Sequence, residues 1–317
     1  MFKGQESLEF LLEQVSKDDP AASSHWQKYH TNFQVNNGNI EGIEGFGSND
    51  SRYTGIRYIL HLILQLRYKL WVLKSWQRLS VFLKLNSLNK KILKRQNKGY
   101  SLDCLRQTFS LTLLITCRQN IFSQRSTVWV IGDGFASMTN LIYESNSCEN
   151  IVLVNLSKTL LVDLVHIKKN LSTKEFNNNV YLVTEKDSLS DISNLLISNN
   201  KKIILLEAKN HILLNHFTSN LVINIASMQE MNNEVIEEYF DHIHNNKNVY
   251  FYCCNREKKV LPDGTITEIK NYPWRENDMV ILDELCPWHQ KYYTFRFPFY
   301  KKYDGPIRHQ LRKMNTN

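Results

Sequence analysis

The sequence predicts an α/β fold: a Rossmann-like, mostly parallel sheet with antiparallel C-terminal strands, preceded by a helical N-terminal segment. From residue 126 onward, short apolar runs alternate with stretches of helical periodicity, which is typical of a parallel sheet with crossover helices. The first of these runs ends in a glycine turn. Residues 249–317 instead hold short apolar runs separated by turns, which indicate added antiparallel strands.

The texture of the chain predicts three segments. Residues 1–55 are polar and form an N-terminal arm with an opening helix over Ser7–Ser16, which Asp19-Pro20 ends. Residues 56–120 form a basic helical segment, and residues 121–317 form the Rossmann-like domain. In residues 56–98 the apolar positions of a helix alternate with Lys and Arg, which suits a peripheral membrane-surface or glycolipid-facing helix. The same pattern fits an amphipathic helix docked on the domain with a solvated basic face.

Within the domain, each apolar run predicts a strand. The predicted parallel strands are Val128–Ile131, Ile151–Val154, Val180–Val183, Ile203–Leu206 and Leu221–Ile225. A helix that Ser157 can cap separates the second strand from the third, and another helix follows Asn233. Farther on, Val249–Cys254 and Thr265–Ile269 flank a Pro-Asp-Gly turn and predict a hairpin, and Met279–Leu282 and Tyr292–Phe299 predict further strands.

Composition limits the partners and the setting. The 317 residues carry a formal net charge of +8, which favours anionic partners such as nucleotide sugars, acidic glycans, lipid surfaces or nucleic acid. The six cysteines show no CxxC pair and no Cys/His ligand spacing, so we expect neither a zinc knuckle nor a disulfide framework, and no metal site. No signal peptide or bilayer-spanning run is visible, so the expected location is cytoplasmic, with the inner face of the membrane as an alternative.

Two features at predicted strand ends point to a nucleoside-containing cofactor. The Gly132-Asp133-Gly134 turn can bring backbone close to a ligand, although a glycine turn also serves strand-to-helix packing. Asn155 follows the second strand, where nucleotide-binding folds place a residue that accepts from ribose hydroxyls. Asn155 can equally form an Asx turn before the next helix.

Three ordered stretches carry a family resemblance. They are Ile223 to Met231 followed by Glu237 to Phe240, then Cys254 to Gly264, then the Tyr272-Pro273-Trp274 and Pro287-Trp288-His289 motifs. Together they resemble the sugar O-methyltransferases of bacterial surface-polysaccharide clusters, over about residues 127–307. The resemblance extends to Ser24-His25-Trp26.

The resemblance implies S-adenosylmethionine as cofactor and a sugar, nucleotide-sugar or glycolipid as acceptor. By position, Gly132, Asp133 and Gly134 would line the amino-acid end of the cofactor and Asn155 would face its ribose. Ile225 and Ser227 would lie beside the cofactor near the acceptor. The chain departs from the usual pattern at Val130, where such enzymes carry an acid, and at Ala136, where they carry a smaller residue such as glycine.

Methyl transfer to a sugar hydroxyl calls for a general base and an acceptor site. Glu230, in the loop after a parallel strand, is the first candidate base, and its alternative role is helix capping or pairing with Arg256. His289 is the second candidate, and its alternative is a neutral histidine in an aromatic wall. Candidate acceptor-binding residues, which could instead form ion pairs or pack in the core, are Asn255, Arg256, Lys258, Trp274 and Trp288.

Three functions follow as hypotheses. The first is an S-adenosylmethionine-dependent sugar O-methyltransferase in surface-polysaccharide biosynthesis. The second is a catalytically inactive relative that serves as a carbohydrate-binding or scaffold subunit in glycan assembly, as the departures at Val130, Ala136 and Asn155 suggest. The third, nucleic-acid methylation, is not expected, because the chain lacks an Asn/Asp-Pro-Pro-Tyr segment and its basic cluster has little aromatic interleaving.

Overall fold

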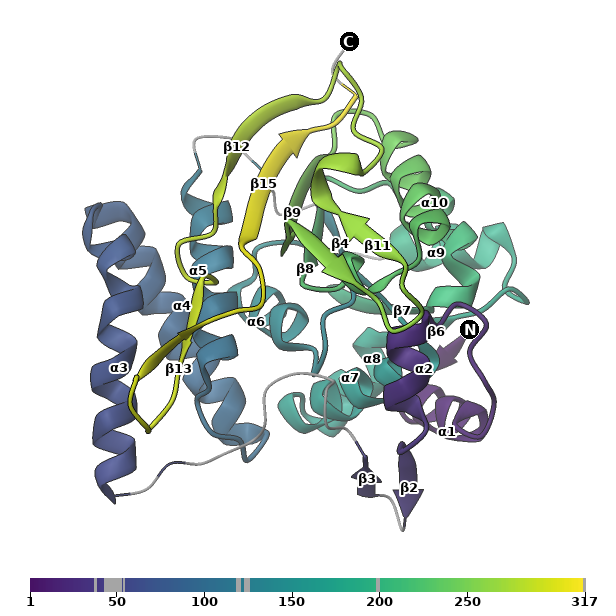
Figure 1. Ribbon diagram of the computed structural model, residues 1–317. Coiled ribbons are helices and arrows are strands. Elements are labelled where there is room, and N and C mark those ends of the chain that lie inside the picture. The colour runs from purple at the N-terminus through teal and green to yellow at the C-terminus, as the bar shows by residue number, and fades with distance from the viewer. Residues whose placement is uncertain are drawn as a thin grey trace.

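The computed structural model describes residues 1–36, 39–42, 53, 55–117, 121–122, 126–197 and 200–315. A nine-stranded sheet in the order β1-β6-β7-β5-β4-β8-β9-β15-β12 runs through the molecule (Figure 1). Its strands are β1 (Phe2–Lys3), β4 (Thr127–Ile131), β5 (Asn150–Asn155), β6 (Val180–Val183), β7 (Lys202–Glu207), β8 (Leu221–Ile225), β9 (Tyr250–Arg256), β12 (Met279–Leu285) and β15 (Ile307–Lys313).

The centre of this sheet is parallel and its two ends are not. Strands β6, β7, β5, β4, β8 and β9 pair in parallel, while β15 pairs antiparallel with both β9 and β12, and β1 pairs antiparallel with β6. The predicted fold class is therefore confirmed: an α/β sheet, mostly parallel, with antiparallel C-terminal strands and helices before it.

Helices cover the sheet and form a separate group at its side. They are α1 (Gly4–Gln14), α2 (Ser24–His30), α3 (Gly55–Leu73), α4 (Trp76–Arg95), α5 (Leu102–Thr116), α6 (Ser137–Ser145), α7 (Ser157–Asn170), α8 (Thr173–Asn179), α9 (Leu189–Ile197) and α10 (Asn233–His244). Figure 1 shows α3, α4 and α5 side by side, with α3 outermost. None of the helices in the described part of the chain is long and apolar enough to cross a membrane.

The central strands are buried on both faces of the sheet. Val128 and Val130 join the core on one side of β4, while Trp129 and Ile131 join the core on the other. Cys253 and Cys254 likewise lie in opposite cores, as their adjacent positions on one strand predict. Because both faces are covered by helices, the sequence of these strands is almost continuously apolar.

The first 36 residues pack on the domain. Strand β1 extends the sheet beside β6, and α1 contacts α7 and α8. Asp19 accepts hydrogen bonds from the backbone N–H and the hydroxyl of Ser157, at 2.8 and 3.1 Å, so the first turn of α7 is capped by this segment and Ser157 is not the cap itself. Residues 43–52 and 54 of the predicted arm lie outside the described residues.

The C-terminal strands differ from the prediction in their partners. The hairpin partner of β11 (Ile266–Glu268) is β10 (Lys258–Val260), while β9 belongs to the large sheet. Within the predicted strand Tyr292–Phe299, only residues 292 and 293 are extended, in β13 (Lys291–Tyr293), which pairs with β14 (Tyr300–Lys302). Strand β15 was not predicted, because its burial depends on β9 and β12. A third two-stranded pair is formed by β2 (Gln34–Asn36) and β3 (Asn39–Glu41).

Candidate functional site

Two adjoining cavities lie at the carboxyl ends of β4, β5 and β8, where α/β sheets bind ligands. The larger has a volume of about 280 Å³, and its lining includes many polar and charged side chains beside apolar surface. The smaller is a slot of about 30 Å³ with apolar walls that include Ala21, Leu156, Ala208 and Val235. The two cavities share five lining residues, which mark their junction: Trp26, Gly132, Asn155, Ser227 and Glu230.

The glycine turn forms one wall of the larger cavity. Gly132 and Gly134 have φ angles of 70° and 65°, and Phe135 and Ala136 follow with 60° and 48°. Left-handed backbone at a non-glycine residue costs about 1–3 kcal/mol, and such strain collects at functional sites. Phe135 lies against Lys98 and His166 in the cavity wall, and Met138 is buried in the core, so the cavity stays open.

Asp133 has a structural role in addition to its place in the cavity lining. Its two carboxylate oxygens accept from the backbone N–H groups of Met138 and Thr139, at 2.8 and 2.7 Å. Asp133 therefore caps the start of α6, although it also lines the cavity. Burial raises its pKa to about 6. Val130, one of the two departures noted in the sequence, is buried in the apolar core and is not available to a ligand.

Asn155 lies at the cavity junction but is engaged with the protein. Its Nδ2 donates to the Asp163 carboxylate at 2.8 Å, and its Oδ1 accepts from the Leu156 N–H at 3.0 Å. Asp163 is fully buried and also accepts from the Ala136 N–H at 2.7 Å, so it ties the end of β5 to the glycine turn. These bonds leave the Asn155 side chain little remaining capacity for the predicted ribose contact. The bond from the Leu156 N–H is to the next residue, so it is not the predicted Asx turn, which would accept from the N–H two residues on.

Glu230 lies at the same junction as an ion-paired carboxylate. Its Oε1 is 2.6 Å from Lys259 Nζ, and its Oε2 is 3.4 Å from His25 Nε2. Burial by itself would raise the pKa of Glu230, but the hydrogen bonds and charges of His25 and Lys259 outweigh it and hold the pKa below its ordinary value. Glu230 is therefore ionised at neutral pH and accepts hydrogen bonds readily, while its low pKa makes it a weak base.

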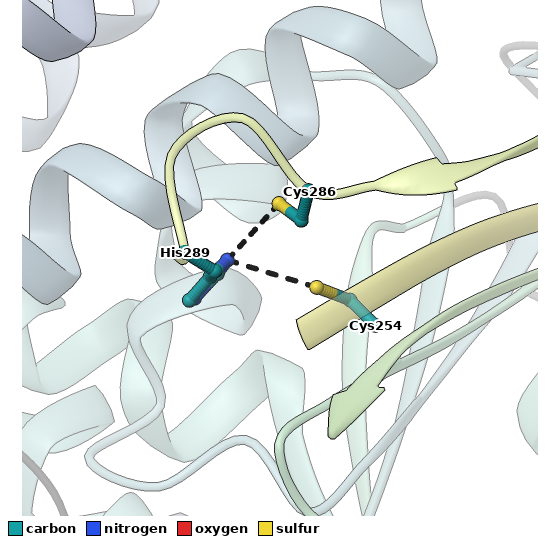
Figure 2. A group of neighbouring side chains, drawn as sticks. All are labelled: Cys254, Cys286 and His289. Atoms are coloured by element: carbon teal, nitrogen blue, oxygen red, sulfur yellow. Dashed lines mark hydrogen bonds between the residues drawn. The ribbon is translucent and has the colours of Figure 1, made fainter. Parts of the chain in front are cut away.

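His289 lines the larger cavity from a loop after β12. Its Nδ1 lies 3.3 Å from Cys286 Sγ and 3.6 Å from Cys254 Sγ, and Figure 2 shows both sulfurs pointing at this nitrogen. Burial lowers the pKa of His289 well below its ordinary value, so the ring is neutral. The aromatic-wall alternative does not describe this environment, because the nearest partners of Nδ1 are two thiols.

Of the predicted acceptor-binding residues, only Arg256 lines a cavity. Asn255 is fully buried, where it donates to Asn224 and accepts from Gln229. Lys258 is exposed and pairs with Glu268 in the β10–β11 hairpin. The predicted stacking of Trp274 and Trp288 on a sugar is wrong for Trp288, which is fully buried in the core. Trp274 packs against Phe240 and donates its Nε1–H to the Ile269 carbonyl.

The two segments before the domain supply the residues that sequence reasoning missed. Trp26 and His25 of α2 reach the junction, and the only signal for them was the resemblance at Ser24-His25-Trp26. The connection between α4 and α5 and the start of α5 add a wall that includes Lys98, Asp103, Arg106 and Gln107. No motif marked these residues, because they approach the sheet only through helix packing.

Arg106 holds the His289 loop in place. Its guanidinium donates to the carbonyls of Trp288 and Lys291 at 3.1 and 2.9 Å, and to Asp103 at 2.7 Å. The side chain is 4% exposed, so these bonds are shielded from water. Such a fork of charge-assisted bonds fixes both ends of the 288–291 loop relative to α5.

Two cavity-lining polar atoms have no protein partner among the described residues. They are Gln107 Oε1 and Thr159 Oγ1, both buried. A buried polar atom without a partner costs about 1–3 kcal/mol. The larger cavity thus carries many polar groups, whereas the slot is narrow and has apolar walls.

Comparison with known proteins gives a distant structural likeness. No known protein-family model matches the chain, and no curated protein matches it. A SAM-dependent methyltransferase from Leishmania major aligns over 67% of this chain and 72% of its own, at 11% identity and a TM-score of 0.38. Coclaurine N-methyltransferase bound to N-methylheliamine and SAH aligns over 72% and 79%, at 12% identity and a TM-score of 0.34. At such low TM-scores these likenesses carry no argument about the site.

Proposed function

We propose that this protein transfers a methyl group from S-adenosylmethionine to a sugar hydroxyl, in the assembly of a surface polysaccharide. One observation supports the cofactor above all: a polar cavity and an apolar slot meet at the carboxyl ends of β4, β5 and β8. S-adenosylmethionine has a flat, weakly polar base at one end and a charged amino acid at the other. The two cavities match these two chemistries, and the junction residues would meet the ribose between them.

Each part of S-adenosylmethionine has a counterpart among the residues that line the two cavities. The glycine turn would approach the amino-acid end, and the slot between Leu156, Ala208 and Val235 would take the base. Ile225 and Ser227, which line the larger cavity, would lie beside the cofactor as the resemblance implies. When bound, the cofactor supplies an electrophilic methyl group, and every other contribution comes from the chain itself.

The chain's own contribution would be to orient the acceptor and to receive its proton. Arg256 and Lys98 line the larger cavity with positive charge, which suits an acceptor that carries phosphate or carboxylate, such as a nucleotide sugar or glycolipid. Glu230 and the neutral imidazole of His289 are two groups in that cavity that could accept the hydroxyl proton, while the carboxylate of Asp133, which also lines the cavity, is engaged in capping α6. Glu230 remains the first candidate, since it lies at the junction where cofactor and acceptor would meet.

Calorimetric titration of the purified protein with S-adenosylmethionine and with its demethylated product tests the cofactor assignment. Binding is expected, and it should weaken at least tenfold in Trp26→Ala, which removes a wall shared by both cavities. Lys258→Ala, on the exposed β10–β11 hairpin, is the matched control and should bind as the wild type does. Absence of binding to either compound would refute the assignment.

The second candidate is a catalytically inactive carbohydrate-binding or scaffold subunit of glycan assembly. It is favoured by the engagement of the expected cofactor ligands within the protein: Asp133 caps α6, Asn155 bonds to Asp163, and Val130 is buried. This candidate predicts that an anionic glycan binds with no cofactor effect. Mass spectrometry of surface glycans from cells with and without the gene separates the two, because only the enzyme changes the mass by one methyl group.

A further inference from the structure

Three metal-binding side chains converge on one buried point beside the larger cavity. Cys254 lies near the end of β9, while Cys286 and His289 lie in the turn that follows β12. The two sulfurs and the His289 Nδ1 all lie within 4.8 Å of one another (Figure 2). Both cysteines are fully buried, and His289 is nearly so. No other cluster of this kind occurs in the described ranges of the chain.

The distances match tetrahedral coordination. With Zn–S bonds of about 2.3 Å and Zn–N bonds of about 2.0–2.1 Å, tetrahedral angles place a sulfur and a nitrogen ligand about 3.6 Å apart. The observed separations from His289 Nδ1 are 3.3 Å to Cys286 Sγ and 3.6 Å to Cys254 Sγ. Hydrogen bonding explains the arrangement less well, because a single ring nitrogen, whether it donates or accepts, can make one full hydrogen bond and not two.

The fold holds these ligands in place before any ion binds. The backbone N–H of His289 donates to the Cys286 carbonyl at 3.2 Å, so both ligands lie in one tight turn. The Cys286 N–H donates to Ile307 at 2.9 Å, which attaches this turn to β15, and Arg106 donates to the Trp288 carbonyl. Cys254 sits in the β9 ladder, opposite His309. Such supporting bonds are what keep a metal site at the required geometry.

We propose that Cys254, Cys286 and His289 bind one Zn²⁺ ion. Two thiolates and one imidazole are a ligand set that suits zinc, and two negative thiolates balance its charge in a buried site. The three protein ligands leave the fourth position to water or to a ligand of the cavity that His289 lines. The ion would fasten the loop after β12 to the end of β9. The proposal is independent of the proposed function.

Metal analysis of the full-length protein tests the site. Elemental mass spectrometry should find about one zinc per chain, and Cys286→Ser and Cys254→Ser should each lose most of it. Cys148→Ser is the matched control, since Cys148 is also buried but lies outside the cluster, and it should keep its zinc. Equal zinc content in Cys286→Ser and Cys148→Ser would overturn the proposal.

A second measurement avoids variants that fail to fold. Wild-type protein stripped with a chelator should take up one Co²⁺ with the absorption of thiolate-to-cobalt charge transfer, and Zn²⁺ should displace it. Failure of the stripped, folded protein to take up either ion would overturn the proposal. Both readouts measure the metal itself, so the methyltransferase assignment can fail without affecting them.

A different observation concerns α3, whose outward face is apolar. Six residues at alternating spacings of three and four form one stripe along the helix: Ile56, Ile59, Ile63, Leu66, Leu70 and Leu73, which are 54–77% exposed. The inward face mixes Leu64 and Val72 with polar groups: His61 bonds to Tyr293, and Tyr68 donates to the Lys291 carbonyl. The apolar side of α3 is therefore covered by no described part of the chain.

Charge decides which partner fits this stripe. Residues 55–98 hold eleven Lys and Arg and no Asp or Glu. Arg67 and Lys74, which are exposed beside the stripe, would face their own copies if two α3 helices paired in parallel, and in any pairing two helices without acidic residues repel each other. We infer that α3 lies on an anionic lipid surface, with the stripe at the acyl boundary and the cations at the headgroups.

Vesicle flotation tests this surface. The protein should float with phosphatidylcholine vesicles that contain phosphatidylglycerol, and not with phosphatidylcholine alone, and added salt should reduce the binding. Ile63→Glu with Leu66→Glu should abolish flotation, while Val260→Glu, a charge placed at an exposed apolar residue elsewhere, should not. No flotation with anionic vesicles, or a dimer in solution that the α3 variant dissociates, would overturn the inference.

Discussion

Gly132 packs directly against Ser227: a β-carbon at Gly132 would lie 1.9 Å from Ser227 Oγ and 2.4 Å from Ser227 Cβ. The turn after β4 and the turn after β8 therefore touch at the junction of the two cavities. Only a residue without a side chain permits this approach, and the φ angle of 70° at Gly132 makes the same demand.

Gly132→Ala should disturb the backbone of the turn after β4 and, with it, the junction of the two cavities. We expect the free energy of unfolding to fall by about 1–3 kcal/mol, from left-handed backbone strain and the clash with Ser227. Cofactor binding should fall with it. Combining Gly132→Ala with Ser227→Gly should recover the steric part and leave the backbone cost, which chemical denaturation can measure. Wild-type stability of Gly132→Ala would contradict the close contact.

Exchanging Asn155 and Asp163 should show that they act as a pair. In the wild type the Asn155 amide nitrogen lies 2.8 Å from an Asp163 carboxylate oxygen. Asn155→Asp would put a second carboxyl group at this distance, so we expect the free energy of unfolding to fall by about 1–3 kcal/mol. The double variant Asn155→Asp with Asp163→Asn keeps a donor and an acceptor at every contact and should restore most of that loss. Additive losses in the double variant would argue against the pair.

The ion pairing of Glu230 predicts its own pH dependence. Because the pKa of Glu230 is lowered in the folded protein, the pairing contributes stability above the ordinary carboxyl pKa of 4.5. That contribution is lost only as the pH falls through the lowered pKa. Unfolding measured from pH 3 to pH 7 should therefore show a smaller acid loss in Glu230→Gln than in the wild type. Identical pH profiles would show that His25 and Lys259 do not stabilise the carboxylate.

Arg106→Lys tests whether the guanidinium fork fixes the loop that carries His289. A lysine keeps the charge but cannot reach both carbonyls and Asp103 with the same geometry. We expect a loss of about 1–3 kcal/mol in unfolding free energy and faster amide exchange across residues 286–291. Amide exchange that rises equally over the whole chain would instead indicate general destabilisation.

The central sheet could be predicted because local pattern and burial agree there. Strands β6 and β8 match the predicted ranges, and β4, β5 and β7 extend them by one or two residues. The C-terminal pairing could not be predicted, since β15 alternates little and owes its place between β9 and β12 to partners on both sides. The same limit explains why residues 258–260 were not expected to pair with β11.

The sequence by itself determined the α/β class, the glycine turn and the position of the acid Glu230 after β8, because each depends on residues that are neighbours in the chain. Only the tertiary structure decided what surrounds them. In the folded protein, Asp133 and Asn155 make hydrogen bonds to other parts of the chain. Packing brings Trp26 and Arg106 to the cavity from the two preceding segments and places Cys254 beside Cys286 and His289. These relationships arise from packing between distant elements, so residue spacing records none of them except the Cys-x-x-His spacing of Cys286 and His289.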